Sequence, residues 1–188
     1  MNIQETVLSG LFIIEPKVFA DSRGYFFEAY NEKSFAENGI NTKFVQDNQS
    51  KSTYGVIRGL HFQLNPNAQT KLVRVLDGVI LDVAVDIRKG SPTYGQYFAV
   101  ELSSENNKQL FIPHGFAHGF SVLSPVAIVL YKCDCLYSPA SEGGLIYNDP
   151  ELNIDWKVDQ SKAIVSPKDL ILPQLKDVVT NFNFKIAY

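Results

Sequence analysis

Apolar and polar residues alternate in short runs along most of this chain, and glycine and proline separate the runs. Such alternation is typical of strands with one buried face, and many short strands with turns between them are typical of sandwiches, jelly rolls and barrels. The pattern therefore predicts an all-β protein. The predicted strands span Gly10–Glu15, Tyr25–Tyr30, Phe44–Asn48, Val56–Phe62, Lys71–Leu76, Val79–Ile87, Tyr97–Leu102, Gln109–Ile112, Gly119–Val122 and Ala127–Tyr137.

Helical signals are confined to two places. One short helix is predicted over Glu32–Glu37, where Asn31 can cap the start and Gly39 can end it. Short helical turns are predicted in the tail, Ser166–Val179. The sequence shows no linker, low-complexity tract or internal repeat, so we expect a single domain over residues 1–188.

The strongest turn signal is Asp77-Gly78, because Asp-Gly favours two-residue hairpins. A hairpin at this point would pair the two flanking strands and place Lys71 and Asp82 on one face, close enough to interact diagonally. The opposite face of the second strand would be wholly apolar. A half-polar interior face is what a barrel with a ligand site at one end would show.

Composition and charge narrow the class of protein. Of the 188 residues, 45% are hydrophobic and 20% charged, which is typical of a globular domain and not of a disordered or fibrous chain. The net charge of −3 argues against general nucleic-acid or anionic-membrane binding, but allows one small anion held by local arginines. No apolar run approaches the roughly 20 residues of a membrane span, and residues 1–6 lack the features of a signal peptide. We therefore expect a cytoplasmic protein.

The only cysteines are Cys133 and Cys135. In a strand their Cα atoms would lie about 6.6 Å apart, at ~3.3 Å per residue, which is at the edge of disulfide reach. We expect reduced thiols, as in other cytoplasmic proteins.

His61 is the first candidate for chemistry, because a histidine can take a proton near neutral pH. Arg58 lies three residues earlier, with Gly59 between them as a possible bend or bulge, and Lys71 follows ten residues later. An isolated histidine is more often structural. Two nearby cations weigh against that reading, because cations are rarely carried into an interior without an anion to meet.

The other two histidines, His114 and His118, have the spacing of a helical zinc site. Pro113, Gly115 and Gly119 argue against a helix there. In a strand, four residues span about 13 Å, which is too far for two ligands of one ion. The spacing therefore disfavours a metal site and a metal-dependent enzyme. A ligand or backbone can approach His118 closely, because Gly119 follows it.

Four side chains of the last predicted strand share a face: Tyr131, Cys133, Cys135 and Tyr137. A tyrosine hydroxyl there could act as an acid, and a second ring could stack on a planar ligand. The alternative is a mixed core face. A carboxylate such as Asp169 could fix the tautomer of a histidine and raise its basicity, but spacing alone does not show that it reaches His61.

Taken together, the motifs resemble the dTDP-4-dehydrorhamnose 3,5-epimerase family. The matching segments run in order along the chain: residues 21–26 (DSRGYF), 46–48 (QDN), 56–63 (VIRGLHFQ), 71–75 (KLVRV), 86–95 (DIRKGSPTYG), 112–120 (IPHGFAHGF), Tyr131, 148–150 (NDP) and 154–156 (IDW). Each piece is weak alone, whereas the ordered set is specific.

This resemblance implies a cupin-type jelly-roll β-barrel, a homodimer, and no metal or organic cofactor. The implied substrate is a dTDP-linked 4-keto-6-deoxyhexose, epimerised at C3 and C5. By resemblance, His61 is the base, held by Asp169, while Lys71 stabilises negative charge on O4. Tyr131 would return a proton from the opposite face of the ring.

The resemblance also implies which residues bind the substrate. Arg58 and His118 would meet the diphosphate or sugar, and Gln46 and Asn48 the phosphate and nucleoside side. The remaining implied contacts, at the nucleotide end and in part across a dimer, are Phe19, Arg23, Glu28, Tyr137 and Glu142. His114 departs from the family, in which many relatives carry an acidic residue at this position.

Three other readings stay open at this stage. One is an enzyme that acts at a single carbon, or on another nucleotide-linked 4-keto sugar. Another is a non-catalytic sugar-binding β-sandwich, in which His61 and Tyr131 would be replaceable without loss beyond binding. The last, a metal-dependent cupin, is disfavoured by the histidine spacing.

Overall fold

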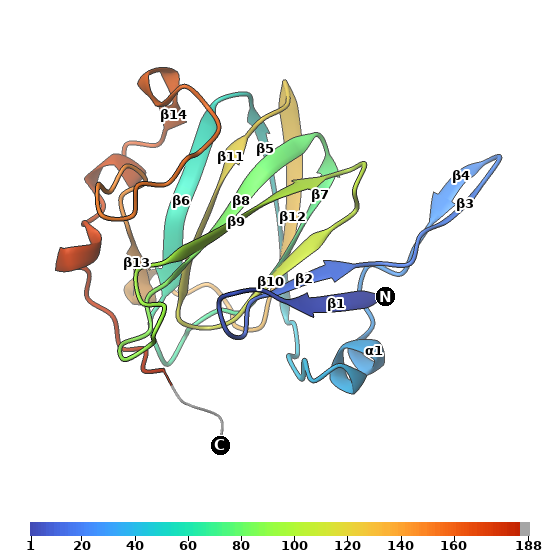
Figure 1. Ribbon diagram of the computed structural model, residues 1–188, viewed down its shortest axis with the longest axis horizontal. Coiled ribbons are helices and arrows are strands. Elements are labelled where there is room, and N and C mark those ends of the chain that lie inside the picture. The colour runs from blue at the N-terminus through green and yellow to red at the C-terminus, as the bar shows by residue number, and fades with distance from the viewer. Residues whose placement is uncertain (185–188) are drawn as a thin grey trace.

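Two antiparallel sheets enclose the apolar centre of the protein in the computed structural model, which describes residues 1–184 (Figure 1). The strands of the first sheet lie in the order β1 (Asn2–Glu5), β2 (Phe12–Glu15), β10 (Gln109–Ile112), β7 (Lys71–Asp77), β12 (Val126–Cys133) and β5 (Gln46–Thr53). The strands of the second lie in the order β13 (Glu142–Gly144), β6 (Val56–Gln63), β11 (Phe116–Val122), β8 (Val79–Asp86) and β9 (Tyr97–Ser103), with β14 (Ile164–Val165) parallel to β6. The all-β jelly-roll prediction is confirmed, although the sheets stay open at their edges.

The predicted helix is confirmed as α1 (Glu32–Glu37), and the Asn31 side chain accepts a hydrogen bond from the Ser34 amide at its start. Gly39 follows it at φ +83°, a conformation that glycine adopts without strain. The tail forms the predicted helical turns as short 3-10 helices. These and two further 3-10 turns are η1 (Pro139–Ser141), η2 (Gln160–Lys162), η3 (Asp169–Ile171) and η4 (Leu175–Asp177). No helix within residues 1–184 is both long and apolar enough to cross a membrane.

The hairpin predicted at Asp77-Gly78 is wrong. Strand β7 pairs with β10 and β12, whereas β8 pairs with β11 and β9, so the turn carries the chain from one sheet to the other. Gly78 is nonetheless needed, because a Cβ there would lie 2.1 Å from the Val126 carbonyl oxygen. Asp-Gly specifies the local turn, while the choice of partner depends on contacts with strands far along the chain.

Strand β8 is buried on both faces, which explains its nearly continuous apolar sequence. One face, with Ile80 and Ala84, packs against the first sheet, and the other, with Val83 and Val85, packs under the C-terminal segment. Trp156 of that segment is fully buried, and its indole N–H donates to the Tyr147 carbonyl at 2.8 Å. The tail therefore covers the outer face of the second sheet (Figure 1).

Several strand ends differ from the prediction. Strand β12 stops at Cys133 and not at Tyr137, because the Asp134 carboxylate accepts from the Thr70 amide at 2.7 Å and turns the chain. The predicted strand Tyr25–Tyr30 is shortened to β4 (Gly24–Phe26), which forms with β3 (Phe19–Asp21) a hairpin that projects from the body (Figure 1). The sequence also gave no signal for the short strands β1, β13 and β14. Both cysteines are free thiols.

Candidate active site

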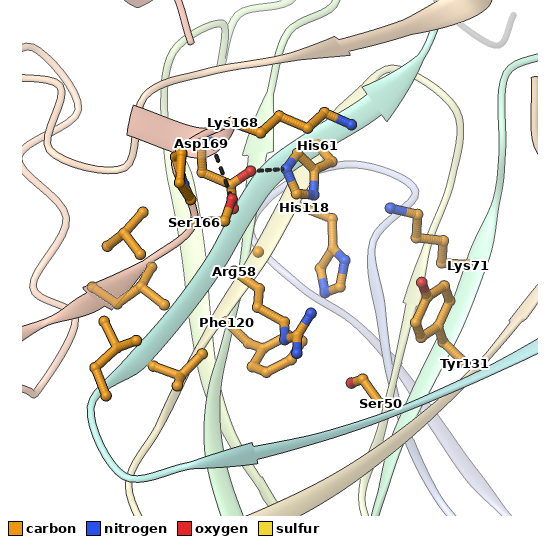
Figure 2. A pocket seen from close by; sticks show the side chains of 16 residues that line it. Ser50, Arg58, His61, Lys71, His118, Phe120, Tyr131, Ser166, Lys168 and Asp169 are labelled. Atoms are coloured by element: carbon orange, nitrogen blue, oxygen red, sulfur yellow. Dashed lines mark hydrogen bonds and ion pairs between the residues drawn. The ribbon is translucent and has the colours of Figure 1, made fainter. Parts of the chain in front are cut away.

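A cavity of about 570 Å³ opens between the two sheets (Figure 2). Its polar lining side chains come from five strands and from the segment that leads into η3. They are Ser50, Arg58, His61, Lys71, His118, Tyr131, Ser166, Lys168 and Asp169. A second cavity of about 300 Å³ adjoins it and shares His61, Lys71 and Tyr131, so these three side chains lie where the two spaces meet.

His61 is held by a carboxylate from the far end of the chain. Its Nε2 lies 2.8 Å from Oδ1 of Asp169, which is 3% exposed (Figure 2). The other oxygen of Asp169 accepts from the Gly59 amide at 3.2 Å. Because an ionised carboxylate only accepts hydrogen bonds, it places the imidazole proton on Nε2 and leaves Nδ1 with a free lone pair. The pair is therefore arranged as a general base with a fixed tautomer.

The environment keeps His61 neutral. Burial lowers the pKa of His61, and the charge of Lys71 lowers it further. Asp169 and, more weakly, Glu142 act in the opposite direction, but burial outweighs them. A base must be unprotonated before it can act, so the lowered pKa favours proton abstraction at neutral pH.

Two glycines explain why Arg58 and His61, three residues apart, reach the same cavity. Between β6 and β11 the register shifts between His118 and Phe120. At this point a Cβ on Gly59 would lie 2.6 Å from the Gly119 Cα, and one on Gly119 would lie 2.6 Å from the Arg58 carbonyl oxygen. The close approach and the bulge interrupt strand alternation, so both side chains face inward.

Lys71 and Tyr131 form the opposite wall (Figure 2). Lys71 Nζ lies 5.9 Å from the centroid of the Tyr131 ring. Burial lowers the pKa of Lys71, while Cys133, Asp82 and Glu142 oppose that change. Burial raises the pKa of Tyr131, as does Cys133, against the charge of Arg58, so the phenol keeps its proton. The wall thus offers a cation and a hydroxyl donor across from the histidine base.

Arg58 and His118, the predicted contacts of the diphosphate or sugar, both line the first cavity. Arg58 Nε donates to Ser52 Oγ at 3.0 Å, and its terminal nitrogens face the cavity (Figure 2). His118 Nε2 lies 2.7 Å from Oδ1 of Asp82, which is fully buried. His118 and His61 are paired residues of the neighbouring strands β11 and β6, so they lie side by side in one sheet. The cavity therefore holds two histidine–aspartate pairs.

Four further predicted residues gather around the second cavity: Gln46, Asn48, Tyr137 and Glu142. Gln46 joins two of them, because its Nε2 donates to Asn48 Oδ1 at 3.0 Å and its Oε1 accepts from the Tyr137 amide at 3.0 Å. The Tyr137 hydroxyl donates to Glu142 at 3.1 Å. These hydrogen bonds make one polar group that could bind the rest of a ligand whose reacting part lies near His61.

Three predicted residues lie outside both cavities of this chain. Phe19 and Arg23 belong to the projecting hairpin, where Phe19 is 55% exposed and Arg23 forms an ion pair with Asp21 at 2.6 Å. Glu28 accepts from Asn31 Nδ2 at 3.0 Å, beside α1. Phe19 and Arg23 line only a separate hollow on the hairpin itself, away from His61.

Sequence reasoning missed two charged residues of the site. Lys168 lines the first cavity and its ammonium is bonded to Glu142, which raises the pKa of Lys168. It directly precedes Asp169, so its position in the sequence was a signal that could have identified it. Asp82 was noted only for its place beside Lys71 in the supposed hairpin.

His114 lies away from the cavity, where Nε2 is 3.0 Å from Asp134. Across residues 1–184, no group of three or more His, Cys, Asp and Glu side chains is placed to hold a metal ion.

The jelly roll defines a cupin-type protein, and its inward histidine–aspartate pair, facing a half-buried lysine and a protonated tyrosine, is an arrangement that can transfer protons. Comparison with known proteins agrees with this class. A model of the family described as dTDP-4-dehydrorhamnose 3,5-epimerase matches residues 5–177. The chain belongs to this family of isomerases.

Individual relatives cover nearly the whole chain. The dTDP-4-dehydrorhamnose 3,5-epimerase of Shigella flexneri is 52% identical over 171 residues, which cover 90% of this chain and 93% of the relative. The crystal structure of the Elizabethkingia anophelis enzyme of the same name is 53% identical, with a TM-score of 0.90, over 94% of this chain and 97% of that one. The Legionella pneumophila dTDP-6-deoxy-D-glucose-3,5-epimerase, solved in complex with dTDP-4-keto-L-rhamnose, is 50% identical, with a TM-score of 0.90, over 95% and 94%.

Proposed function

We propose that this protein epimerises C3 and C5 of dTDP-4-dehydro-6-deoxy-D-glucose to give dTDP-4-dehydro-L-rhamnose, a step of dTDP-L-rhamnose biosynthesis. The observation that carries the proposal is the placement of His61 and Tyr131 on opposite walls of one cavity, with Lys71 beside them. Inversion at carbon needs a base on one face of the ring and an acid on the other.

The C4 ketone makes the protons at C3 and C5 acidic. His61 Nδ1 takes one of these protons, the C–H electron pair moves into the ring, and negative charge develops on O4. The Lys71 ammonium stabilises that charge electrostatically. The Tyr131 hydroxyl then gives its proton to the carbon from the opposite face, which inverts the centre. Exchange with solvent returns His61 and Tyr131 to their starting protonation states.

The remaining polar residues are assigned to binding. Arg58 and His118 contact the sugar or the diphosphate, and Gln46 and Asn48 contact the phosphate and nucleoside side. Tyr137 and Glu142 complete the nucleotide end of the second cavity. Their support is the hydrogen-bonded group that they form around a space continuous with the reacting residues.

We further propose that the active unit is a homodimer. Phe19, Arg23 and Glu28 lie outside the cavities of their own chain, and the β3–β4 hairpin projects with its aromatic side chains exposed. In a dimer, these residues would contact the nucleotide that is bound in the cavity of the second copy. We also assign the protein to the cytoplasm, without an organic or metal cofactor and as a single domain, on the sequence arguments above.

The experiment that tests the function is incubation with dTDP-4-keto-6-deoxyglucose in D₂O, followed by NMR. We expect deuterium at both C3 and C5. The His61→Asn variant should lose this exchange by about 10²–10⁴-fold, the usual contribution of a general base, while still binding dTDP. His114→Asn is the matched control, because His114 has the same kind of aspartate partner outside the cavity; it should exchange at the wild-type rate.

The outcomes separate the alternatives. Deuterium at one carbon only would make the protein a mono-epimerase. Exchange with a sugar linked to a different nucleotide, but not with the dTDP sugar, would change the substrate. Binding without any exchange would indicate a sugar-binding module and overturn the proposal.

A further inference from the structure

Asp82 is a buried carboxylate with one unpaired oxygen. It lies in the middle of β8 and is 0% exposed. Its Oδ1 accepts from His118 Nε2 at 2.7 Å, whereas its Oδ2 is buried and has no hydrogen-bond partner among residues 1–184. Desolvating a carboxylate oxygen without a partner is unfavourable, so such an atom calls for a compensating charge nearby.

Lys71 is a half-buried cation on the opposite sheet. It lies on β7 of the first sheet, across the interior from Asp82 on β8 of the second, and Asp82 acts to raise the pKa of Lys71. Within the described residues, Lys71 Nζ forms no ion pair, and its ring contact is with Tyr131. His118 connects the two groups, because it is bonded to Asp82 and lines the same cavity as Lys71.

The other groups around Lys71 do not supply the same charge. On β12, the Tyr131 phenol is protonated, and burial raises the pKa of Cys133 to about 11, so its thiol is uncharged near neutral pH. On β13, Glu142 already shares its charge with Lys168 and the Tyr137 hydroxyl.

The remaining neighbours on β6 and β11 are not anions at all. His61 supplies no negative charge, and Lys71 lowers the pKa of His61. Arg58 is a cation, and His118 is the group that Asp82 already binds. Asp169, the other buried carboxylate of the site, uses both oxygens, on His61 and the Gly59 amide. Among the described residues that surround the cavity, Asp82 is therefore the buried carboxylate with an oxygen left unpaired to compensate Lys71.

Building on the proposed epimerase reaction, we propose that Asp82 is a positioning residue that acts through two partners. One oxygen fixes the tautomer and orientation of His118 at the sugar. The other holds a fixed negative charge that keeps Lys71 protonated, and so able to stabilise the O4 anion. The carboxylate does not touch the reacting atoms.

The test is Asp82→Asn, which keeps the size of the side chain and an oxygen for His118 but removes the charge. We expect the Lys71 pKa to fall by about one unit, a tenfold change in its protonation equilibrium, in NMR titrations of selectively labelled lysine. The alkaline limb of kcat/KM should move down by the same amount. Asp134→Asn is the control, because it neutralises the aspartate of a histidine pair outside the cavity, and it should leave both values unchanged.

Rescue separates the charge from the packing. Lys71→Arg puts a guanidinium that stays charged in place of the ammonium, so adding Asp82→Asn to Lys71→Arg should not shift the alkaline limb further. An Asp82→Asn protein whose Lys71 titrates as in the wild type overturns the proposal. So does a wild-type Lys71 that is neutral at pH 7, a result that needs no variant. Both readouts concern a lysine pKa in the resting protein, so they stay decisive even if the substrate assignment is wrong.

Discussion

At the scale of the residue, three histidines carry the same partner in three different settings. His61, His118 and His114 each place Nε2 within 3.0 Å of an aspartate oxygen. The settings decide their roles, because His61 lies at the junction of the two cavities, His118 is buried on the wall of one, and His114 is half exposed outside both. A histidine–aspartate pair alone is thus not a catalytic signal.

The acid limb of the pH profile follows from His61. Because its pKa is lowered, the neutral base persists below the ordinary histidine value of about 6.5. We expect kcat/KM to stay level from pH 8 to about 6.5 and to fall only at lower pH, as protonation removes the base. Steady-state rates between pH 4.5 and 8 measure this.

Asp169→Asn tests the same assignment with a defined sign. Asp169 raises the pKa of His61, so removing its charge should move the acid limb to still lower pH. The rate at the plateau should fall by about 10²–10⁴-fold, because the fixed tautomer is lost. An acid limb that moves to higher pH would contradict this account of the pair.

Tyr131→Phe separates proton removal from proton return. The variant keeps the ring beside Lys71 but lacks the acidic hydroxyl. We expect solvent exchange at the substrate carbons to continue, while formation of the inverted product falls by about 10²-fold or more. Tyr54→Phe, at an exposed tyrosine, is the control. Unchanged stereochemistry and rate of product formation in Tyr131→Phe would remove the hydroxyl from the mechanism.

At the scale of the element, local sequence signals predicted the helix and the turns, but they did not predict which strands pair. The helix and its cap, the inward lysine and the run around His61 follow from alternation and turn chemistry, which act within a few residues. The assignment of β7 and β8 to different sheets does not, because it depends on β10, β11 and β12, which lie later in the chain.

Two of the recognised motifs turn out to be structural. The Asp86 carboxylate accepts hydrogen bonds from Arg88, Ser91 and Thr93, which closes the loop between β8 and β9. Asp149 accepts from the Leu175 amide at 2.6 Å and so ties η4 to the body. Neither carboxylate lines the cavities, and the sequence did not separate such motifs from those of the site.

Gly119→Ala tests the close approach of β6 and β11. The added methyl group would collide with the Arg58 carbonyl and the Gly59 backbone, so we expect a loss of about 2–4 kcal/mol in unfolding free energy and a displaced His61. Gly90→Ala is the comparison, because Gly90 has φ +80° and open space around it, and strain alone should cost about 1 kcal/mol. Urea denaturation measures both; equal losses would mean that the two strands can move apart freely.

At the scale of the whole molecule, the site draws on residues far apart in sequence. His61 and Asp169 are separated by 108 positions and meet only because the tail returns to β6, where β14 runs parallel to it. No periodicity predicts such a contact, so the role of Asp169 rested on resemblance alone. The same limit applies to Phe19, Arg23 and Glu28, which lie outside both of the cavities that share His61.

Mixing two impaired variants tests the proposed dimer. His61→Asn lacks the proposed base. Arg23→Ala lacks the hairpin cation, and the lost nucleotide contact should cost at least about tenfold in kcat/KM. If the hairpin serves the partner's site, a mixed dimer contains one complete site, and activity should rise above the sum of the separate variants. Light scattering of the wild type should give twice the mass of one 21.0 kDa chain.

The matched control mixes His61→Asn with Tyr131→Phe. Both residues belong to the cavity of one chain, so no combination of these two chains restores a complete site. Restored activity in this control, or none in the Arg23→Ala mixture, would contradict the exchange of hairpins between copies.

The return of the tail to β6 also determines when, during synthesis, Asp169 can reach His61. A chain is synthesised from its N-terminus, so His61, Lys71 and Tyr131 leave the ribosome well before Asp169 does. Until η3 docks and its carboxylate reaches His61 and the Gly59 amide, the histidine lacks its fixed tautomer. A chain that stops before this segment therefore lacks both the carboxylate that orients His61 and the part of the cavity lining that Ser166 and Lys168 supply.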